Sequence, residues 1–169
     1  MKRVINIFCV LIMCAFILPS CAKKQDGNVL SRSFQGETWG RFDYLNASYN
    51  VVSPMTADVV MELEVSEVFP NIYPYHADDN GMFAFVMSVN APDGSRRARE
   101  YRFMLKDEEG KFKAENKNGY YHYELPLLSE MSFDANGEYT FKLENKYPRD
   151  PLYGIRSLNI KCMQIKKKK

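Results

Sequence analysis

The residues that could carry out acid–base or metal chemistry are few and lie far apart in the chain. The two histidines, His76 and His122, fall in different segments, and neither has a partner at metal-ligand spacing. The chain contains no Gly-x-Ser-x-Gly nucleophile motif, phosphate-binding loop or dinucleotide fingerprint. The sequence therefore predicts no catalytic residues and no cofactor, and we expect a protein that is not an enzyme.

The best candidate for a metal site is the run Asp78-Asp79-Asn80-Gly81. Calcium-binding loops place their oxygen ligands at alternating positions, whereas these residues are consecutive. Asp, Asn and Gly are also typical of turns, for which their backbone preferences suit them. We interpret the run as a turn and predict no metal site, with weak calcium binding as the alternative.

Aromatic residues are stronger candidates for binding than the acidic ones. The segment 69–75 holds Phe69, Tyr73 and Tyr75 together with two prolines. Proline stiffens a loop, so its rings would lose little entropy on binding. The rings could stack against a sugar, a peptide or a partner protein, or they could fold over the open end of the domain and close its core.

A second concentration of rings is the run Tyr120-Tyr121-His122-Tyr123. In a strand, successive side chains point to opposite faces. Tyr121 and Tyr123 should therefore share one face with Leu125, while Tyr120 and His122 lie on the opposite, exposed face. We predict that Tyr120 and His122 belong to a binding surface.

Cys21 stands where a lipid would be attached. Lys2 and Arg3 give a positive start, an apolar run covers residues 4–18, and Leu18-Pro19-Ser20 leads into the cysteine. This is the layout of a secretory signal peptide, and a cysteine at the cleavage point indicates a bacterial lipoprotein. We predict that residues 1–20 are removed and that acyl chains such as palmitate tether Cys21 to a membrane. An ordinary signal peptide and an uncleaved anchor are the alternatives, although the apolar run is shorter than the about 20 residues that span a bilayer.

Cys162 is the only free thiol that this processing leaves, because Cys9 and Cys14 depart with the signal. The mature domain can then form neither an internal disulfide nor a cysteine-rich metal site. Cys162 alternates with Leu158 and Ile160, so we expect a buried core residue rather than a nucleophile.

The charge balance argues against nucleic acid as a partner. The chain has 23 Lys and Arg residues and 21 Asp and Glu residues, and removal of residues 1–20 takes away Lys2 and Arg3. The mature domain is then formally neutral and has no global basic field. The remaining basic feature is the C-terminal run Lys166–Lys169. We interpret this run as a solvated tail, and contact with an anionic headgroup or an acidic partner is the alternative.

The spacing of apolar residues predicts an all-β fold. Large apolar residues recur at every second position in four segments, 59–65, 83–89, 101–105 and 139–143, as in strands with one buried face. Turn sequences lie between these segments: Pro92-Asp93-Gly94, Asp107–Gly110, Asn118-Gly119 and Asn136-Gly137. We predict an antiparallel β-sandwich of seven to eight strands, Ig-like or jelly-roll-like, over residues 34–169. Residues 21–33 should form a lipidated, flexible tether.

Two single residues refine this prediction. Tyr139 follows the turn glycine Gly137 at the start of a strand, as in the tyrosine corner, where the phenol bonds to the preceding loop. Trp39, the only tryptophan, precedes the first predicted strand, and we expect it to pin the N-terminal arm onto the domain.

The order of these features resembles the gliding-motility lipoprotein GldH family of Bacteroidota across nearly the whole mature chain. The matching elements follow the lipoprotein signal in this order: Trp39–Asp43, Val68-Phe69, Tyr73–Tyr75, Ala91–Gly94, Phe103–Asp107, a Gly-containing hairpin, Glu124–Leu127, Gly137–Phe141 and Leu152–Leu158. The resemblance implies a β-sandwich envelope lipoprotein associated with the machinery that moves surface adhesins, which is linked to a secretion system. It supplies no catalytic residues.

We therefore expect a non-enzymatic cell-envelope lipoprotein that docks partner proteins of a gliding-motility or linked secretion apparatus. Ala22-Lys23-Lys24 lacks the acidic cluster that would resemble a surface-export signal, so we expect the protein at the outer membrane, facing the periplasm. The alternative is a carbohydrate-binding module that captures glycan at the membrane with the same aromatic residues.

Overall fold

The protein is built from strands. The computed structural model describes residues 27–70 and 81–165, and within these ranges eight strands have seven residues or more: β1 (Gly27–Ser33), β3 (Leu45–Val51), β4 (Met55–Val65), β5 (Met82–Asn90), β6 (Arg96–Met104), β8 (Tyr120–Phe133), β9 (Gly137–Asn145) and β11 (Ile155–Gln164). The same ranges contain a short 3-10 helix and three strands of two residues: η2 (Gln35–Glu37), β2 (Thr38–Trp39), β7 (Asn116–Lys117) and β10 (Leu152–Tyr153).

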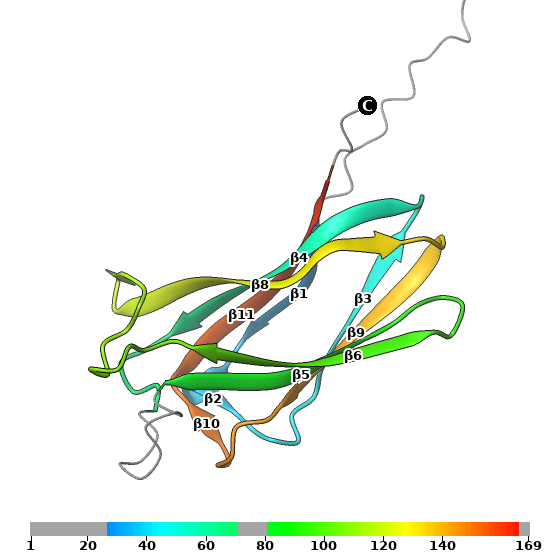
Figure 1. Cartoon of the computed structure of the whole chain (residues 1–169). Helices are drawn as coiled ribbons and strands as arrows, with labels where there is room; N and C mark the ends of the chain where they lie inside the picture. Colours follow the sequence, from blue (N-terminus) through cyan, green and yellow to red (C-terminus); the bar gives the residue numbers. More distant parts are fainter. Residues whose placement is uncertain (1–26, 71–80, 166–169) are drawn as a thin grey trace, which may run out of the picture.

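The strands form two large antiparallel sheets. The five-stranded sheet has the order β1-β11-β4-β8-β7, and the four-stranded sheet has the order β3-β9-β5-β6. Figure 1 shows the two sheets stacked face to face, with the small β2–β10 pair at one end. The predicted antiparallel sandwich is therefore confirmed, and the eight longer strands of the described ranges agree with the predicted number. No helix in the described part of the chain is long and apolar enough to cross a membrane.

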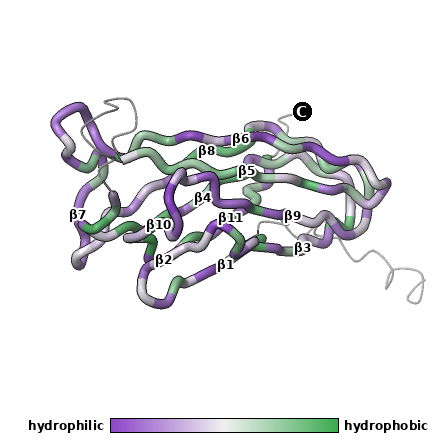
Figure 2. The backbone as a smooth tube through the Cα atoms, turned by 90° about the horizontal axis from the view of Figure 1, so that it is seen from below, coloured by the Kyte–Doolittle hydropathy of each residue, from purple (hydrophilic) through white to green (hydrophobic). Residues whose placement is uncertain are grey.

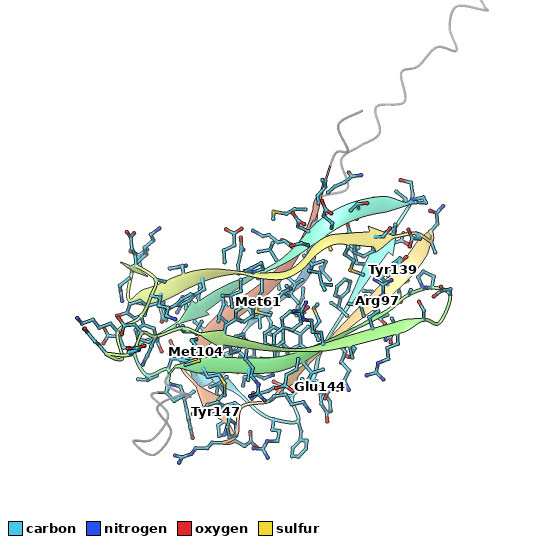
Figure 3. All side chains as sticks on the ribbon, viewed as in Figure 1. Met61, Arg97, Met104, Tyr139, Glu144 and Tyr147 are labelled. Atoms are coloured by element: carbon cyan, nitrogen blue, oxygen red, sulfur yellow. The ribbon has the colours of Figure 1, made fainter. Side chains whose placement is uncertain are left out.

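Alternation along the strands builds the core between the sheets. Every second residue of β4, from Met55 to Val65, is buried. Figure 2 shows hydrophobic and hydrophilic residues following one another along the strands, and Figure 3 shows Met61 among the side chains that fill the space between the sheets. Burying a large apolar side chain contributes about 1.5–3 kcal/mol, so this pattern specifies which face of each strand turns inward.

Trp39 lies inside the core. Its side chain is fully buried in β2, with ring centroids 5.8 Å from Phe34 and 6.2 Å from Phe83. The indole Nε1–H donates a hydrogen bond to the carbonyl oxygen of Asp43 at 2.8 Å. A buried indole needs such a partner for its polar edge, and this one joins the segment before β3 to the core.

The predicted tether ends earlier than residue 33. Gly27–Ser33 forms β1, which pairs with β11 from Gly27 opposite Cys162 to Ser33 opposite Ser157. The prediction of a flexible segment is therefore corrected for residues 27–33. The reason is that an edge strand is held by backbone hydrogen bonds to one neighbour and needs few apolar residues, and here Val29 alone is buried.

The tyrosine corner is present. The backbone N–H of Ala135 donates a hydrogen bond to the Tyr139 hydroxyl at 3.2 Å. The Tyr139 ring is buried and meets Phe133 edge-on, with centroids 4.9 Å apart. The residue therefore joins the turn before β9 to the core, as its position in the sequence predicted.

Candidate functional site

Tyr120 begins β8 on the outer face of the five-stranded sheet. Its hydroxyl donates to Glu37 Oε1 at 2.9 Å and accepts from Arg156 Nη1 at 2.6 Å. The Arg156 guanidinium also lies over the ring, 4.1 Å from its centroid. Residues from η2, β8 and β11 thus hold one half-buried phenol in a fixed orientation.

His122 lies two residues further along β8 and on the same face. The strand register places it opposite Glu64 of β4, and His122 Nδ1 is 3.2 Å from Glu64 Oε1. Glu64 also accepts a 2.8 Å hydrogen bond from Ser157 Oγ and lies 3.6 Å from Arg156 Nε. Arg156 therefore contacts both Tyr120 and Glu64, and so connects Tyr120 with the partner of His122.

These five residues, Glu37, Glu64, Tyr120, His122 and Arg156, form what we call the Tyr120–His122 face. Beside it lies a shallow depression of about 370 Å³, lined in part by Glu62, Glu124 and Asn159. The face combines a carboxylate pair, an imidazole and a guanidinium in one network, and it can present directed hydrogen bonds to a partner. In the described ranges, no group of three or more His, Cys, Asp or Glu side chains could hold a metal ion.

Tyr121 and Tyr123 turn toward the interior, as strand alternation predicted. Tyr121 stacks on Phe112 with ring centroids 3.8 Å apart. The Tyr123 hydroxyl donates to the carbonyl oxygen of Leu105 at 2.6 Å, and burial raises the pKa of this phenol. The two tyrosines therefore support the packing, and the outer face keeps Tyr120 and His122.

Phe69 is not available to a partner. Its side chain is 1% exposed and belongs to the hydrophobic core. Lys106 Nζ donates to its carbonyl oxygen at 2.9 Å, and burial lowers the pKa of that ammonium group. The prediction of Phe69 as a binding residue is therefore corrected, because its ring closes the core. Tyr73 and Tyr75 lie outside the described residues, as do His76 and the acidic run at 78–80.

Cys162 is buried in β11, and burial raises the pKa of its thiol to about 12. Since the thiolate is the nucleophilic form, this thiol is inert at neutral pH. The predicted core role is confirmed. Cys21 lies outside the described residues.

The sequence did not lead us to a cleft at the open side of the sandwich. The cleft encloses about 390 Å³ between β6 and the end of β8. It is lined by apolar residues, by Arg97 and Arg99 of β6, and by the polar residues Ser129, Glu130 and Ser132 of β8. The signal was present in the sequence, since both arginines occupy positions of β6 that share a face with Tyr101, where an apolar residue would be expected.

The fold and these surfaces define a class, namely an antiparallel β-sandwich domain that presents polar networks and an open edge to solvent. The family model described as GldH lipoprotein matches residues 31–162, and the chain belongs to this family. Membership of a lipoprotein family makes it a membrane-anchored protein of the cell envelope. No curated protein matches the chain.

Two solved structures are similar to the chain over most of its length. One is an exo-β-1,3-galactanase from Phanerochaete chrysosporium with galactose, at 11% identity and a TM-score of 0.33, covering 82% of this chain. The other is the VP2 subviral particle of infectious bursal disease virus, at 9% identity and a TM-score of 0.37, covering 88%. The chain spans 27% and 36% of the lengths of these two proteins.

Proposed function

We propose that this protein is a non-enzymatic envelope lipoprotein that docks partner proteins of a gliding-motility apparatus or of a secretion apparatus linked to it. The observation that carries the proposal is the family match, which runs from β1 to β11 and so covers almost all of the described sandwich. A sandwich of this size, held at a membrane, is suited to presenting fixed surfaces to other proteins.

The docking surface that we propose is the Tyr120–His122 face. Its polar groups are already oriented by one another, so they lose little conformational entropy when a partner binds. The His122 side chain is 40% exposed and reaches solvent beside Glu64. Tyr73 and Tyr75 add to the docking surface in this proposal, on the strength of their sequence context alone.

Acylation at Cys21 is the proposed anchor, with the domain on the periplasmic side of the outer membrane. Labelling of cells with a palmitate analogue should mark the full chain and should not mark the Cys21→Ser variant. Protease added to intact cells should leave the protein whole. Complete digestion without lysis would place the domain on the outside of the cell instead.

The docking role is tested by photocrosslinking in the native membrane. We would place benzoylphenylalanine at position 122 of the full-length lipoprotein and identify its adducts by mass spectrometry. Adducts with an envelope protein are expected, and their yield should fall in the Tyr120→Phe variant, which loses the hydroxyl that joins Glu37 to Arg156. Tyr153→Phe is the matched control, because Tyr153 is exposed on β10.

The same experiment separates protein docking from the carbohydrate alternative. Adducts with glycan alone at position 122 would replace the docking role with glycan capture. In the Tyr73→Ala/Tyr75→Ala variant, we expect an intact fold and weaker retention of the partner in a pull-down from membranes. Loss of the fold in that variant would assign both rings to the core.

A further inference from the structure

One side of the sandwich is open along the edges of two strands. β6 is the last strand of the four-stranded sheet. In the five-stranded sheet, β7 covers the outer edge of β8 only at Tyr120 and Tyr121. Beyond Tyr121, within the described ranges, the facing edges of β6 and β8 have no strand partner. A free strand edge presents unpaired backbone groups that can template another strand.

Two tyrosines close one half of this side. The Tyr101 hydroxyl of β6 donates to the carbonyl oxygen of Leu127 at 3.0 Å. The Tyr123 hydroxyl of β8 donates to the carbonyl oxygen of Leu105 at 2.6 Å. These two hydrogen bonds hold β6 and β8 together from Tyr101 to the end of β6. Any opening between the two strands must therefore lie along the start of β6, before Tyr101.

The other half opens because β8 is irregular there. Its pairing with β4 shifts register on both sides of Val59, and Glu130 has a left-handed φ of 52°. The Glu130 backbone N–H donates to Asp58 Oδ1 at 2.9 Å, which holds the bulge against β4. Bulges bend the strand that contains them. The end of β8 and the start of β6 thus enclose the cleft of about 390 Å³.

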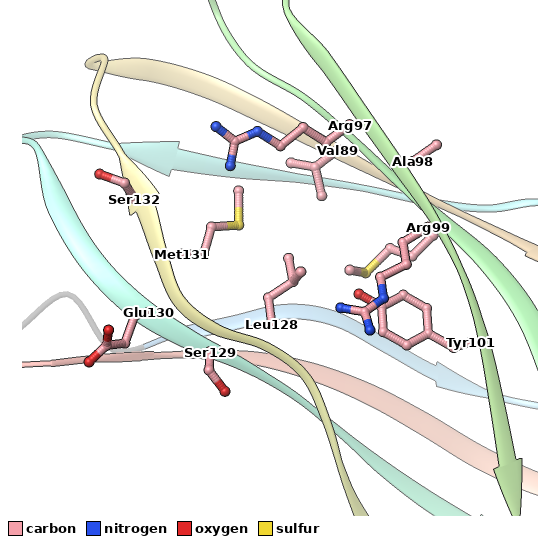
Figure 4. A pocket seen from close by; sticks show the side chains of 11 residues that line it. Val89, Arg97, Ala98, Arg99, Tyr101, Leu128, Ser129, Glu130, Met131 and Ser132 are labelled. Carbon is pink, nitrogen blue, oxygen red and sulfur yellow. The ribbon is translucent and has the colours of Figure 1, made fainter.

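The cleft has an apolar floor, a cationic wall along β6, and the polar residues Ser129, Glu130 and Ser132 on the side of β8. Met87 and Val89 of β5 and Leu128 and Met131 of β8 supply the apolar surface. Arg99 and Arg97 stand opposite Met87 and Val89 in the register of β5 and β6. Figure 4 shows both guanidinium groups extending from β6 over the cleft, toward β8.

Arg97 and Arg99 are available to bind an anionic partner. In the part of the chain that the structure describes, neither Arg97 nor Arg99 forms a salt bridge; Arg99 lies 5.3 Å from the Tyr101 ring centroid. The strand as a whole is strongly basic, since Arg96–Met104 contains four arginines and one acidic residue, Glu100. An arginine fork binds carboxylate in a bidentate geometry.

This charge decides between the possible occupants. A second copy of the chain, paired through β6, would bring two arginine-rich strands together, and like charges across a strand pair are destabilising. An extended segment that carries acidic and apolar residues together on one face, at every second position, has the complementary pattern. Its carboxylates would face Arg97 and Arg99, its apolar side chains would fill the floor, and its backbone would pair with the free edge of β6.

We infer that the cleft between β6 and β8 binds an extended acidic–apolar segment of a partner protein, which adds as a strand to β6. This inference rests on the proposed docking role and names the chemistry of one partner element. The site is distinct from the Tyr120–His122 face.

The test uses the full-length lipoprotein in its own membrane, with benzoylphenylalanine at Ala98, which is exposed on β6 beside the cleft. We expect adducts with a segment of an envelope protein that carries acidic and apolar residues at every second position, and so on one face of the added strand. The Arg97→Glu/Arg99→Glu variant should lower the yield of adducts about tenfold, because each introduced glutamate would repel an acidic residue of the partner segment. Arg102→Glu is the control, a single charge reversal on the opposite face of β6, and it should leave the yield unchanged.

Several outcomes would overturn the inference. Adducts at Ala98 with a second copy of this chain, with lipid, or with a neutral or basic segment would each exclude the proposed occupant. The absence of any adduct at Ala98 would exclude the site. An unchanged yield in the Arg97→Glu/Arg99→Glu variant would exclude the role of the two arginines. Circular dichroism of each variant checks that the sandwich remains folded. Adducts with a partner at position 122 and none at Ala98 would remove the cleft and leave the docking role standing, whereas the absence of protein adducts at both positions would remove the docking role itself.

Discussion

Gly27 and Cys162 lie directly opposite each other in the antiparallel pair of β1 and β11. The chain therefore enters the sandwich at the same end at which it leaves, and the Ile165 backbone N–H donates to the Thr56 carbonyl at that end. The six residue steps from Cys21 to Gly27 span at most about 20 Å. The lipid that we propose on Cys21 would therefore keep this end of the domain near the bilayer, and Ile165, which immediately precedes the C-terminal lysine run in the sequence, lies at this end.

This proximity predicts a second contact with the membrane. Replacing Lys166–Lys169 with serine in an unlipidated Cys21→Ser form should weaken binding to vesicles that contain phosphatidylglycerol by roughly tenfold or more, because each lysine near an anionic surface contributes about 1 kcal/mol. Cosedimentation measures the binding, and neutral phosphatidylcholine vesicles are the control. Equal binding of both forms to anionic vesicles would assign the lysines to a solvated tail.

Gly154 predicts a strong effect on stability. A Cβ atom there would lie 2.4 Å from the Phe69 backbone nitrogen, and the residue has a φ of +77°. Gly154→Ala should lower the free energy of unfolding by about 3 kcal/mol or more, from strain and overpacking together. Gly94→Ala is the matched control, because Gly94 has a φ of +83° and open space around it, so that its cost should be about 1–2 kcal/mol. Urea unfolding measures both, and similar losses would contradict the close approach.

The backbone at Gly154 also explains why the sequence mispredicted Phe69. The alternation of β4 and β9 could be read directly, because period-two burial is a local property of a strand. The burial of Phe69 is not local, since it depends on contacts with Gly154 and with Lys106, which are distant in the chain. A ring beside prolines in a loop carries no local sign of such contacts.

The cleft between β6 and β8 could not be predicted without the topology of the sheets. Arg97 and Arg99 break the apolar alternation of β6, and that break is visible in the sequence. The sequence does not show that β6 and β8 are facing edges, nor that a bulge at Glu130 draws them apart. Tyr120 and His122 were predicted correctly as neighbours on one outward face, but their partners Glu37 and Arg156 come from separate elements.

The tyrosine corner predicts a small and specific loss of stability. Tyr139→Phe removes the acceptor for the Ala135 N–H and should lower the free energy of unfolding by about 1 kcal/mol. Tyr44→Phe is the matched control. Its ring is 44% exposed, and its hydroxyl has no hydrogen-bond partner among the described residues, so the change should be close to zero. Urea unfolding of the two variants beside the wild type makes the comparison, and an equal response would remove the role of the Ala135 bond.

The raised pKa of the Cys162 thiol predicts that the protein loses stability in alkaline solution. The pKa of its thiol is raised by burial from 9.0 to about 12 in the folded protein. As the pH rises above 9.0, the unfolded chain releases this proton while the folded protein keeps it. The free energy of unfolding should therefore fall by about 1.4 kcal/mol for each pH unit between these two values.

The Cys162→Ala variant isolates this contribution. It should be less stable at neutral pH, because truncation leaves a cavity in the core, and its stability should fall less steeply with pH by about 1.4 kcal/mol per unit. Burial also raises the pKa of Tyr101 and of Tyr123, but these phenols are present in both proteins, so their effect cancels in the comparison of slopes. Urea unfolding at several pH values from neutral to above 10 gives the two slopes. Parallel slopes would mean that the thiol titrates alike in the folded and unfolded chains, and that Cys162 is reached by solvent in the folded state.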